Sequence, residues 1–199
     1  MKASKLLDPP PTPAGYRAPY RFEFPKVLLN VVSLVLFIVL IPLLWQLIWW
    51  LQGQPAPRSF TISGFQDLFV LIVVGVLVPV LTIVCHELIH GLAFQLLGYK
   101  ASYGIYWGLG PYAAAFGQFQ TRQHSIIVVL APLILINMLM LLLLAIPDLI
   151  VRAIACIALL FNTSGATGDL YLTWRLWRTP SGTLSYDVDK YNSFVFEPE

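Results

Sequence analysis

Charged side chains are scarce in this chain of 199 residues. Asp, Glu, Lys and Arg together make up 11% of the sequence, whereas hydrophobic residues make up 58%. Soluble globular domains carry roughly 25% charged residues, so the deficit excludes an ordinary soluble domain and indicates an integral membrane protein. The formal net charge of +2 is also too small to indicate a nucleic-acid partner.

Cysteine is scarce as well. The two cysteines, Cys85 and Cys156, both fall inside apolar runs, so no disulfide framework is indicated and both side chains are expected to pack within membrane spans. Cys85 precedes His86, but neighbouring residues on a helix point about 100° apart. Cys85 is therefore not expected to share a metal ion with His86.

Long hydrophobic runs, by contrast, occur in four places. A transmembrane helix needs roughly 20 apolar residues, and residues 27–51, 65–97, 125–146 and 149–177 are each long enough. The last run is interrupted by the polar stretch "NTSGATGD". We therefore expect an all-α integral membrane protein with about four transmembrane helices.

The two ends of the chain are its polar parts. We expect residues 1–26 to form a proline-rich, loosely attached tail, residues 27–178 the membrane domain, and residues 179–199 a solvated acidic tail. Lys and Arg accumulate on the cytoplasmic side of membrane proteins. Ten of the 12 in this chain lie in the N-terminal segment, in the segment between the second and third runs, or near or beyond the end of the last run, and only Arg58 and Arg152 lie on the other side of the membrane. Both termini are therefore predicted to be cytoplasmic.

The second hydrophobic run contains the sequence "HELIH" at residues 86–90. Positions i and i+4 share one face of a helix, so His86 and His90 present two imidazoles side by side, a pair that zinc accepts readily. Glu87 is placed to take a proton from a metal-bound water. Because ionisable side chains inside a membrane span are costly, this group predicts a site for one Zn²⁺ per chain, with Glu87 as the catalytic base.

Two histidines leave a catalytic zinc one protein ligand short. His90 lies eight residues before Gly98, or roughly 12 Å along a helix, and Asp169 lies six residues before Arg175, or roughly 9 Å. Both helices are predicted to end on the cytoplasmic side, so the two depths agree. Asp169 is therefore predicted to be the third metal ligand.

Two residues of the interrupted run are further candidates. Asn162 lies seven positions before Asp169, so the two share a helix face, and Asn162 could orient a metal ligand or bind substrate. Gly168 would let a helix or an extended substrate strand approach closely. Ordinary helix packing with one polar contact is the alternative for both residues, and the sequence leaves both interpretations open.

The segment between the second and third runs, residues 99–124, alternates aromatic, small and polar residues around Gly108, Gly110 and Pro111. This pattern predicts either a β-hairpin that forms one wall of a cleft or an interfacial loop held by its aromatic side chains. His124 ends the segment, where an interfacial histidine is ordinary. A secondary contact to metal or substrate is the alternative for His124.

These motifs together resemble the core of the site-2 proteases, the intramembrane zinc metalloproteases. The likeness is closest to small bacterial and archaeal membrane proteins grouped as zincin peptidases of unknown function, in which a "PY" loop and a later "GD" follow the helix motif. It covers roughly residues 80–175. In that superfamily two histidines and an aspartate bind zinc and the glutamate is the general base, which maps onto His86, His90, Asp169 and Glu87.

The metal site is thus predicted from the residues themselves, whereas peptide hydrolysis is what the resemblance implies. We expect a zinc-dependent intramembrane or membrane-proximal endopeptidase of a prokaryotic cytoplasmic membrane. Its partners would be the lipid bilayer and a membrane or membrane-proximal protein substrate. The alternative is a non-catalytic metal-binding membrane scaffold or regulator, which the presence of Glu87 disfavours. The sequence does not indicate an oligomeric state.

Overall fold

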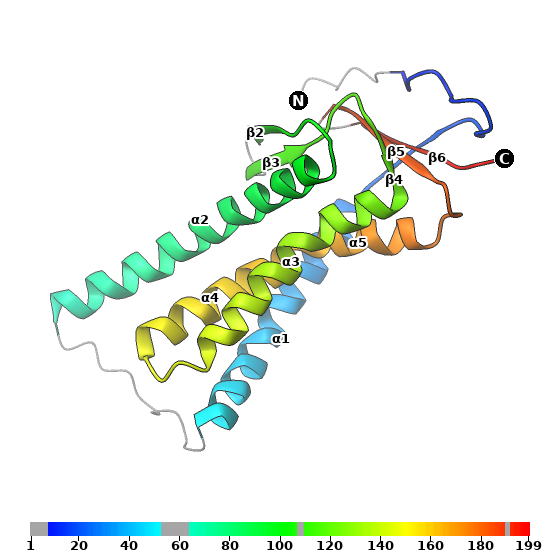
Figure 1. Cartoon of the computed structure of the whole chain (residues 1–199). Helices are drawn as coiled ribbons and strands as arrows, with labels where there is room; N and C mark the ends of the chain where they lie inside the picture. The colour runs from blue at the N-terminus through cyan, green and yellow to red at the C-terminus, as the bar shows by residue number, and fades with distance from the viewer. Residues whose placement is uncertain (1–7, 53–63, 107–109, 190–191) are drawn as a thin grey trace. The chain divides into compact units, whose positions relative to one another are not determined.

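The computed structural model describes residues 8–52, 64–106, 110–189 and 192–199. Most of them are helical, and the helices coincide with the predicted hydrophobic runs (Figure 1). The last run is divided into two helices. The five helices are α1 (Lys26–Gln52), α2 (Phe65–Leu96), α3 (Arg122–Leu144), α4 (Leu149–Gly165) and α5 (Thr167–Trp177).

Three of these helices, α1, α2 and α3, are long and apolar enough to cross a membrane. The bent pair of α4 and α5 raises the number to four if it is counted as one span. These assignments rest on length and composition within the described residues. They agree with the predicted number of spans and with a membrane location.

Helix α4 begins at an aspartate cap and ends at the break in the last run. The side chain of Asp148 accepts a hydrogen bond from the backbone N–H of Val151, which satisfies one of the unpaired donors of the first turn. The chain leaves the helix at Ala166 (φ −76°, ψ 13°) and becomes helical again at Thr167. The restart places Asp169 in the first turn of α5.

The described chain forms two compact units, and α2 and α3 each contribute to both. The sheet unit comprises Met1–Lys26, Glu87–Ala131 and Gly168–Glu199, and the helical unit comprises Val27–His86 and Pro132–Thr167. In the helical unit, Leu44, Leu144, Ala155 and Leu159 form a buried apolar cluster.

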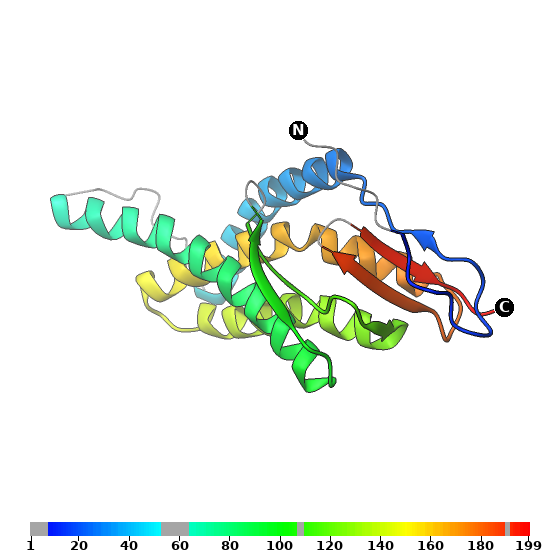
Figure 2. The ribbon, with the colours of Figure 1, turned by 90° about the horizontal axis from the view of Figure 1, so that it is seen from above.

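The sheet unit contains a four-stranded antiparallel sheet with the strand order β1-β6-β5-β4. Figure 2 shows β5 and β6 side by side near the C-terminus. Because β1 comes from the N-terminal segment and pairs with β6, both ends of the chain contribute to this sheet. The strands are β1 (Tyr20–Arg21), β4 (Phe119–Thr121), β5 (Leu184–Asp189) and β6 (Asn192–Phe196).

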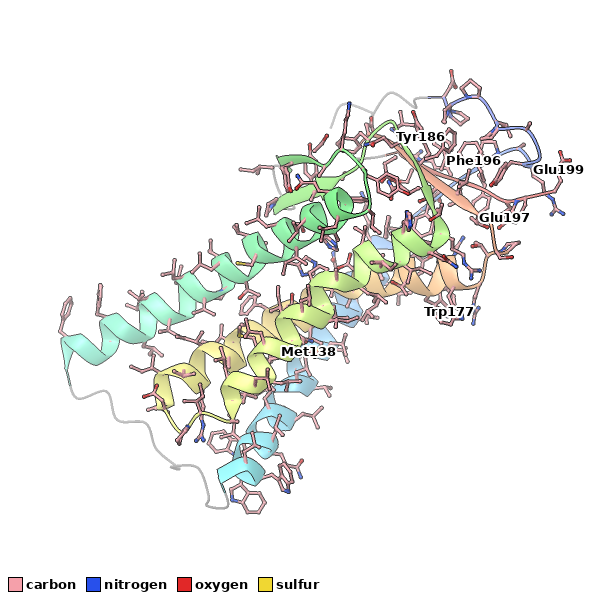
Figure 3. All side chains as sticks on the ribbon, viewed as in Figure 1. Met138, Trp177, Tyr186, Phe196, Glu197 and Glu199 are labelled. Atoms are coloured by element: carbon pink, nitrogen blue, oxygen red, sulfur yellow. The ribbon has the colours of Figure 1, made fainter. Side chains whose placement is uncertain are left out.

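This sheet corrects two expectations. The fold is mostly helical but not all-α, and neither terminal segment is merely loosely attached or solvated. Phe196 is fully buried, and the ring of Phe119 lies 4.8 Å from that of Tyr186 and 5.3 Å from that of Phe196; Tyr186 and Phe196 are labelled in Figure 3. The acidic residues of the C-terminal segment suggested solvation, but Asp189 instead accepts hydrogen bonds from the backbone and side chain of Asn192 at the β5–β6 turn.

Of the two interpretations of residues 99–124, a β-hairpin or an interfacial loop, the hairpin is confirmed. Strands β2 (Ser102–Tyr106) and β3 (Gly110–Ala114) pair antiparallel, with Tyr103 opposite Ala113. The hairpin lies above the C-terminal end of α2 in Figure 1, and it crosses the helix when seen from above in Figure 2. Residues 107–109 lie outside the described chain, and with them Gly108 of the predicted turn.

The hairpin approaches α2 closely at Gly91, the residue after the second histidine of the motif. A Cβ placed on Gly91 would overlap the ring and hydroxyl of Tyr103. The Tyr103 hydroxyl also lies 3.5 Å from Nε2 of Gln95, within hydrogen-bond distance. Gly91 therefore allows β2 to pack directly against the helix that carries the histidines.

Candidate metal centre

His86 and His90 lie one turn apart on α2, and each places one ring nitrogen against an oxygen. Nδ1 of His86 lies 2.8 Å from Oδ1 of Asn162, and Nδ1 of His90 lies 2.9 Å from the carbonyl oxygen of Val128. These oxygens only accept, so Nδ1 carries the proton in both rings. A neutral ring protonated on Nδ1 leaves Nε2 as the nitrogen that can bind a metal.

The carbonyl of Val128 is available because of a proline one turn further along α3. Residue 132 would normally donate its N–H to the carbonyl of residue 128, but Pro132 has no N–H. The helix therefore leaves this acceptor for His90. The sequence contains the signal, a proline inside a hydrophobic run, but does not say which side chain would use the carbonyl.

Asn162 is 2% exposed and is held by further hydrogen bonds. Its Nδ2 donates to Oδ1 of Asn137 at 2.8 Å and to the carbonyl oxygen of Pro132 at 3.3 Å. These two acceptors fix the orientation of the amide, so that Oδ1 points at His86. Both interpretations of Asn162 allow this polar contact, and its role in orienting a metal ligand stays a prediction. Asn137 was missed, although a lone polar residue within "LILINMLML" was the signal for it.

Asp169 lies beside the two histidines, as expected from its predicted depth in the membrane. Its Oδ2 lies 3.6 Å from Nε2 of His90. The ligand atoms of His86, His90 and Asp169 all lie within 4.8 Å of one another. Two imidazole nitrogens and one carboxylate oxygen are a donor set that zinc uses in catalytic sites, so these residues fit a zinc ion.

Gly168 precedes Asp169 at the start of α5, and its surroundings are open. A Cβ on Gly168 would meet no atom of the described chain within 4 Å. No protein segment described here needs the space that the glycine leaves. A role for Gly168 in binding substrate stays a prediction.

Glu87 reaches the hairpin. Its Oε2 accepts a hydrogen bond of 2.9 Å from the backbone N–H of Ala113 on β3. The carboxylate of the predicted base is therefore positioned by the strand that packs over α2.

His124 has a structural contact. Its Nδ1 lies 2.8 Å from the hydroxyl of Tyr99, and the two rings meet edge to face with centroids 5.6 Å apart. The same hydroxyl accepts from the backbone N–H of Thr121 at 3.4 Å. His124 at the start of α3 thus contacts Tyr99, which follows the end of α2.

The sheet unit encloses a cavity of about 230 Å³ that is lined by Glu87, His90 and Asp169. Its lining also includes residues of both terminal segments, among them Phe22 of the N-terminal segment and Asp187 of β5. Sequence reasoning missed this lining, because it treated both terminal segments as separate from the site.

Burial raises the pKa of the Asp187 carboxyl above its ordinary value. Two neutral donors oppose that shift: the hydroxyl of Ser193 at 2.6 Å and the side-chain amide of Gln120 at 3.3 Å. Desolvation is the larger influence. A carboxylate at this position is therefore held by hydrogen bonds but is costly to ionise.

The described chain thus combines helices that are long and apolar enough to cross a membrane with a His-His-Asp group that could hold a metal ion. Residues 79–184, more than half of the chain, match the family described as "Putative zincin peptidase". The chain belongs to this family. The family implies zinc as the metal and indicates metallopeptidase activity. Neither a curated protein nor a solved structure matches the chain.

Proposed function

We propose that this protein is a zinc-dependent endopeptidase that cleaves membrane or membrane-proximal proteins, in the manner of the site-2 proteases. The observation that carries the proposal is the grouping of His86, His90 and Asp169, with both histidines oriented to offer Nε2. Glu87 adjoins this group and faces the same cavity as His90 and Asp169.

His86, His90 and Asp169 would hold one zinc ion per chain. When bound, zinc supplies an activated water and a Lewis acid for the scissile carbonyl. The hydrogen bonds from Nδ1 of each histidine keep the rings in the orientation that the ion needs, and such supporting contacts raise metal affinity about 10–100-fold.

Glu87 would act as the base and then as the acid of the hydrolysis. Its carboxylate takes a proton from the attacking water and later returns it to the leaving amine of the cleaved peptide. The backbone N–H of Ala113, which bonds Oε2, holds the carboxylate for both steps.

The membrane location is supported by the surface of the helices. Along α1, Val27 is 80% exposed and Leu34 is 60% exposed, and on α2 Val76 is 62% exposed. An apolar surface of this extent needs lipid or another apolar partner. We propose α1 to α3, with α4 and α5 as a fourth, broken span, as the transmembrane part. Both termini would face the cytoplasm of a prokaryotic cell.

A substrate helix must unwind before its peptide carbonyl can be attacked, because a helix keeps its backbone hydrogen bonds internal. An edge of the β2–β3 hairpin could hold the unwound segment by strand addition. Asn162 would support His86 during the reaction, and the open surroundings of Gly168 leave room for substrate backbone.

Metal analysis of the purified protein tests the site. We expect about one zinc per chain, and we expect Asp169→Asn to lose it because one of the three ligands becomes a poor donor. Asp148→Asn is the matched control, since it removes the same charge at the cap of α4 and asparagine still caps a helix. Full zinc occupancy in Asp169→Asn would show that the third ligand is wrong.

The second candidate is a metal-binding membrane scaffold or regulator without hydrolysis. It predicts that the protein binds zinc and that Glu87→Gln changes no peptide cleavage, because the protein itself cleaves none. The hydrogen bond between Glu87 and Ala113 also suits a purely structural role. The two functions are therefore separated by Glu87→Gln, which keeps an acceptor for Ala113 but cannot serve as a base.

A further inference from the structure

The cavity beside the metal centre has a polar wall that the proposed hydrolysis does not use. The wall consists of side chains from β4, the start of α3, β5 and β6, all within the sheet unit. Two of them are almost fully buried, Gln120 with 3% and Ser125 with 6% exposure. We call this set the polar wall: Gln120, Ser125, Ser185, Asp187 and Ser193.

The polar wall is one connected hydrogen-bond network that ends on the carboxylate of Asp187. Oδ1 accepts from the hydroxyl of Ser193 at 2.6 Å and Oδ2 accepts from Nε2 of Gln120 at 3.3 Å. Oε1 of Gln120 in turn accepts from the hydroxyl of Ser125 at 3.4 Å, and that hydroxyl lies 2.8 Å from the hydroxyl of Ser185. Because these donors are neutral, they position the carboxylate without cancelling its charge.

The charges around the cavity are unbalanced in a specific way. Three carboxylates line it, those of Glu87, Asp169 and Asp187. Among the described residues that line it, none is Lys or Arg. A bound Zn²⁺ would offset Glu87 and Asp169, which leaves Asp187 as the carboxylate still in need of a cation. A charge in such a cavity is stabilised by an opposite charge beside it. Burial raises the pKa of Asp187 because it removes water from the carboxylate.

We propose that Asp187 is a subsite for an organic cation of the peptide substrate: the side chain of a lysine or arginine, or the N-terminal ammonium. The inference rests on the proposed peptidase function and adds a substrate class to it. The cavity, of about 230 Å³, is smaller than the roughly 300–1,000 Å³ of a pocket for a whole drug-sized ligand. It therefore suits one side chain or one terminal residue.

The apolar part of the lining fits the same occupant. Phe22, Phe24 and Phe194 line the cavity together with Asp187. Long cationic side chains bury their methylene stems against apolar surface, and aromatic rings attract cations. The cavity thus offers a surface for the stem and a carboxylate for the charged head.

The test is a binding measurement on the full chain in lipid nanodiscs, loaded with zinc and carrying Glu87→Gln so that no peptide is consumed. The probes are peptides Ac-Ala-Ala-Xaa-Ala-Ala-amide with lysine, arginine, norleucine or glutamate as Xaa. An alanine pentapeptide amide with a free or an acetylated N-terminus completes the set. We expect a cationic probe to bind about tenfold more tightly than its neutral counterpart, and the probe that does so identifies the source of the cation.

Adding Asp187→Asn should reduce that preference to within about threefold, because asparagine keeps an acceptor for Ser193 but carries no charge. Glu199→Gln is the charge-matched control: this exposed terminal residue does not line the cavity, and the full preference should persist. Equal binding of cationic and neutral probes, or a preference that survives Asp187→Asn, overturns the proposal.

A second measurement does not depend on whether an Asp187 variant folds. On the chain with native Asp187, n-butylammonium should displace the preferred cationic probe at a concentration about tenfold lower than butan-1-ol. Equal displacement by the two overturns the subsite. Neither result depends on turnover, so loss of the cation preference is distinguishable from failure of the peptidase proposal, which would appear as absent zinc or absent cleavage.

Discussion

His86 and His90 illustrate how single residues set the chemistry of the site. Each ring uses Nδ1 for a hydrogen bond to an oxygen, from Asn162 or from Val128, so Nε2 is the nitrogen left for a metal. Spacing along the helix predicted the pair, and depth predicted Asp169. Asn162 was already a candidate to orient a metal ligand, but the carbonyl of Val128 could not be predicted, because its availability depends on Pro132.

Pro132→Ala tests that dependence. An alanine at this position supplies an N–H that competes with His90 for the carbonyl of Val128. Loss of such a supporting contact costs about 10–100-fold in metal affinity, and because the carbonyl can accept two hydrogen bonds we expect the lower end, about tenfold. Competition with a zinc-binding dye would measure it.

Pro42→Ala is the matched control, since Pro42 also lies inside an apolar helix and the same substitution should leave zinc affinity unchanged. If both variants bind zinc as tightly as the native chain, the account of Pro132 is wrong.

At the scale of elements, hydrophobic length predicted the helices. The polar stretch "NTSGATGD" was expected to lie within one helix whose face Asn162 and Asp169 share, but the chain divides there and the two residues lie in separate helices, α4 and α5. The alternating pattern of residues 99–124 indicated either a hairpin or an interfacial loop, and the chain forms the hairpin β2–β3. The four-stranded sheet was not predicted, because its strands have two to six residues and β1 pairs with β6 from the other end of the chain. Short strands with distant partners leave little local pattern.

Gly91→Ala tests the packing of the hairpin on α2. The new methyl group would overlap the ring and hydroxyl of Tyr103. We expect the displaced ring to move β2, and with it β3, which carries the N–H that bonds Glu87. We expect zinc content to be retained but turnover to fall about tenfold or more, since small displacements of catalytic groups are costly. Zinc analysis and peptide-cleavage assays on the same preparation would separate the two effects.

The control for this variant is Gly75→Ala in the same helix. A Cβ on Gly75 would meet no atom of the described chain within 4 Å, and alanine stabilises a helix interior relative to glycine by roughly 0.5–1 kcal/mol. Turnover should be native in Gly75→Ala, and native turnover in Gly91→Ala as well would contradict the packing argument.

At the scale of the whole chain, the terminal segments prove to be structural parts of the sheet unit and not appendages. Phe22 and Asp187 come from opposite ends of the sequence and line one cavity with Glu87. A cavity assembled from such distant segments has no local sequence signature, which is why Asp187 escaped prediction while the HELIH residues did not.

Asp187 gives the stability of the folded chain a specific dependence on pH. Its pKa is raised by burial above the ordinary 3.8, so the unfolded chain loses this proton at a lower pH than the folded chain. The resulting contribution favours the folded state in acid and declines as the pH rises from that ordinary value through the raised one. Asp187→Asn removes the titration.

We therefore expect Asp187→Asn to raise the melting temperature at pH 7 relative to the native chain, with the advantage vanishing as the pH approaches 3.8. Thermal unfolding in detergent across this range would measure it. An advantage that is constant with pH would show that Asp187 does not titrate in this way.

The most direct test of the account compares membrane-protein fragments in two cell populations by quantitative proteomics. One population expresses the native chain and the other expresses Glu87→Gln at an equal level and with equal zinc content. We predict fragments that end within or beside membrane spans in the first population and their absence in the second. The same fragments at the same abundance in both populations would contradict the assignment of Glu87 as the base of a zinc peptidase.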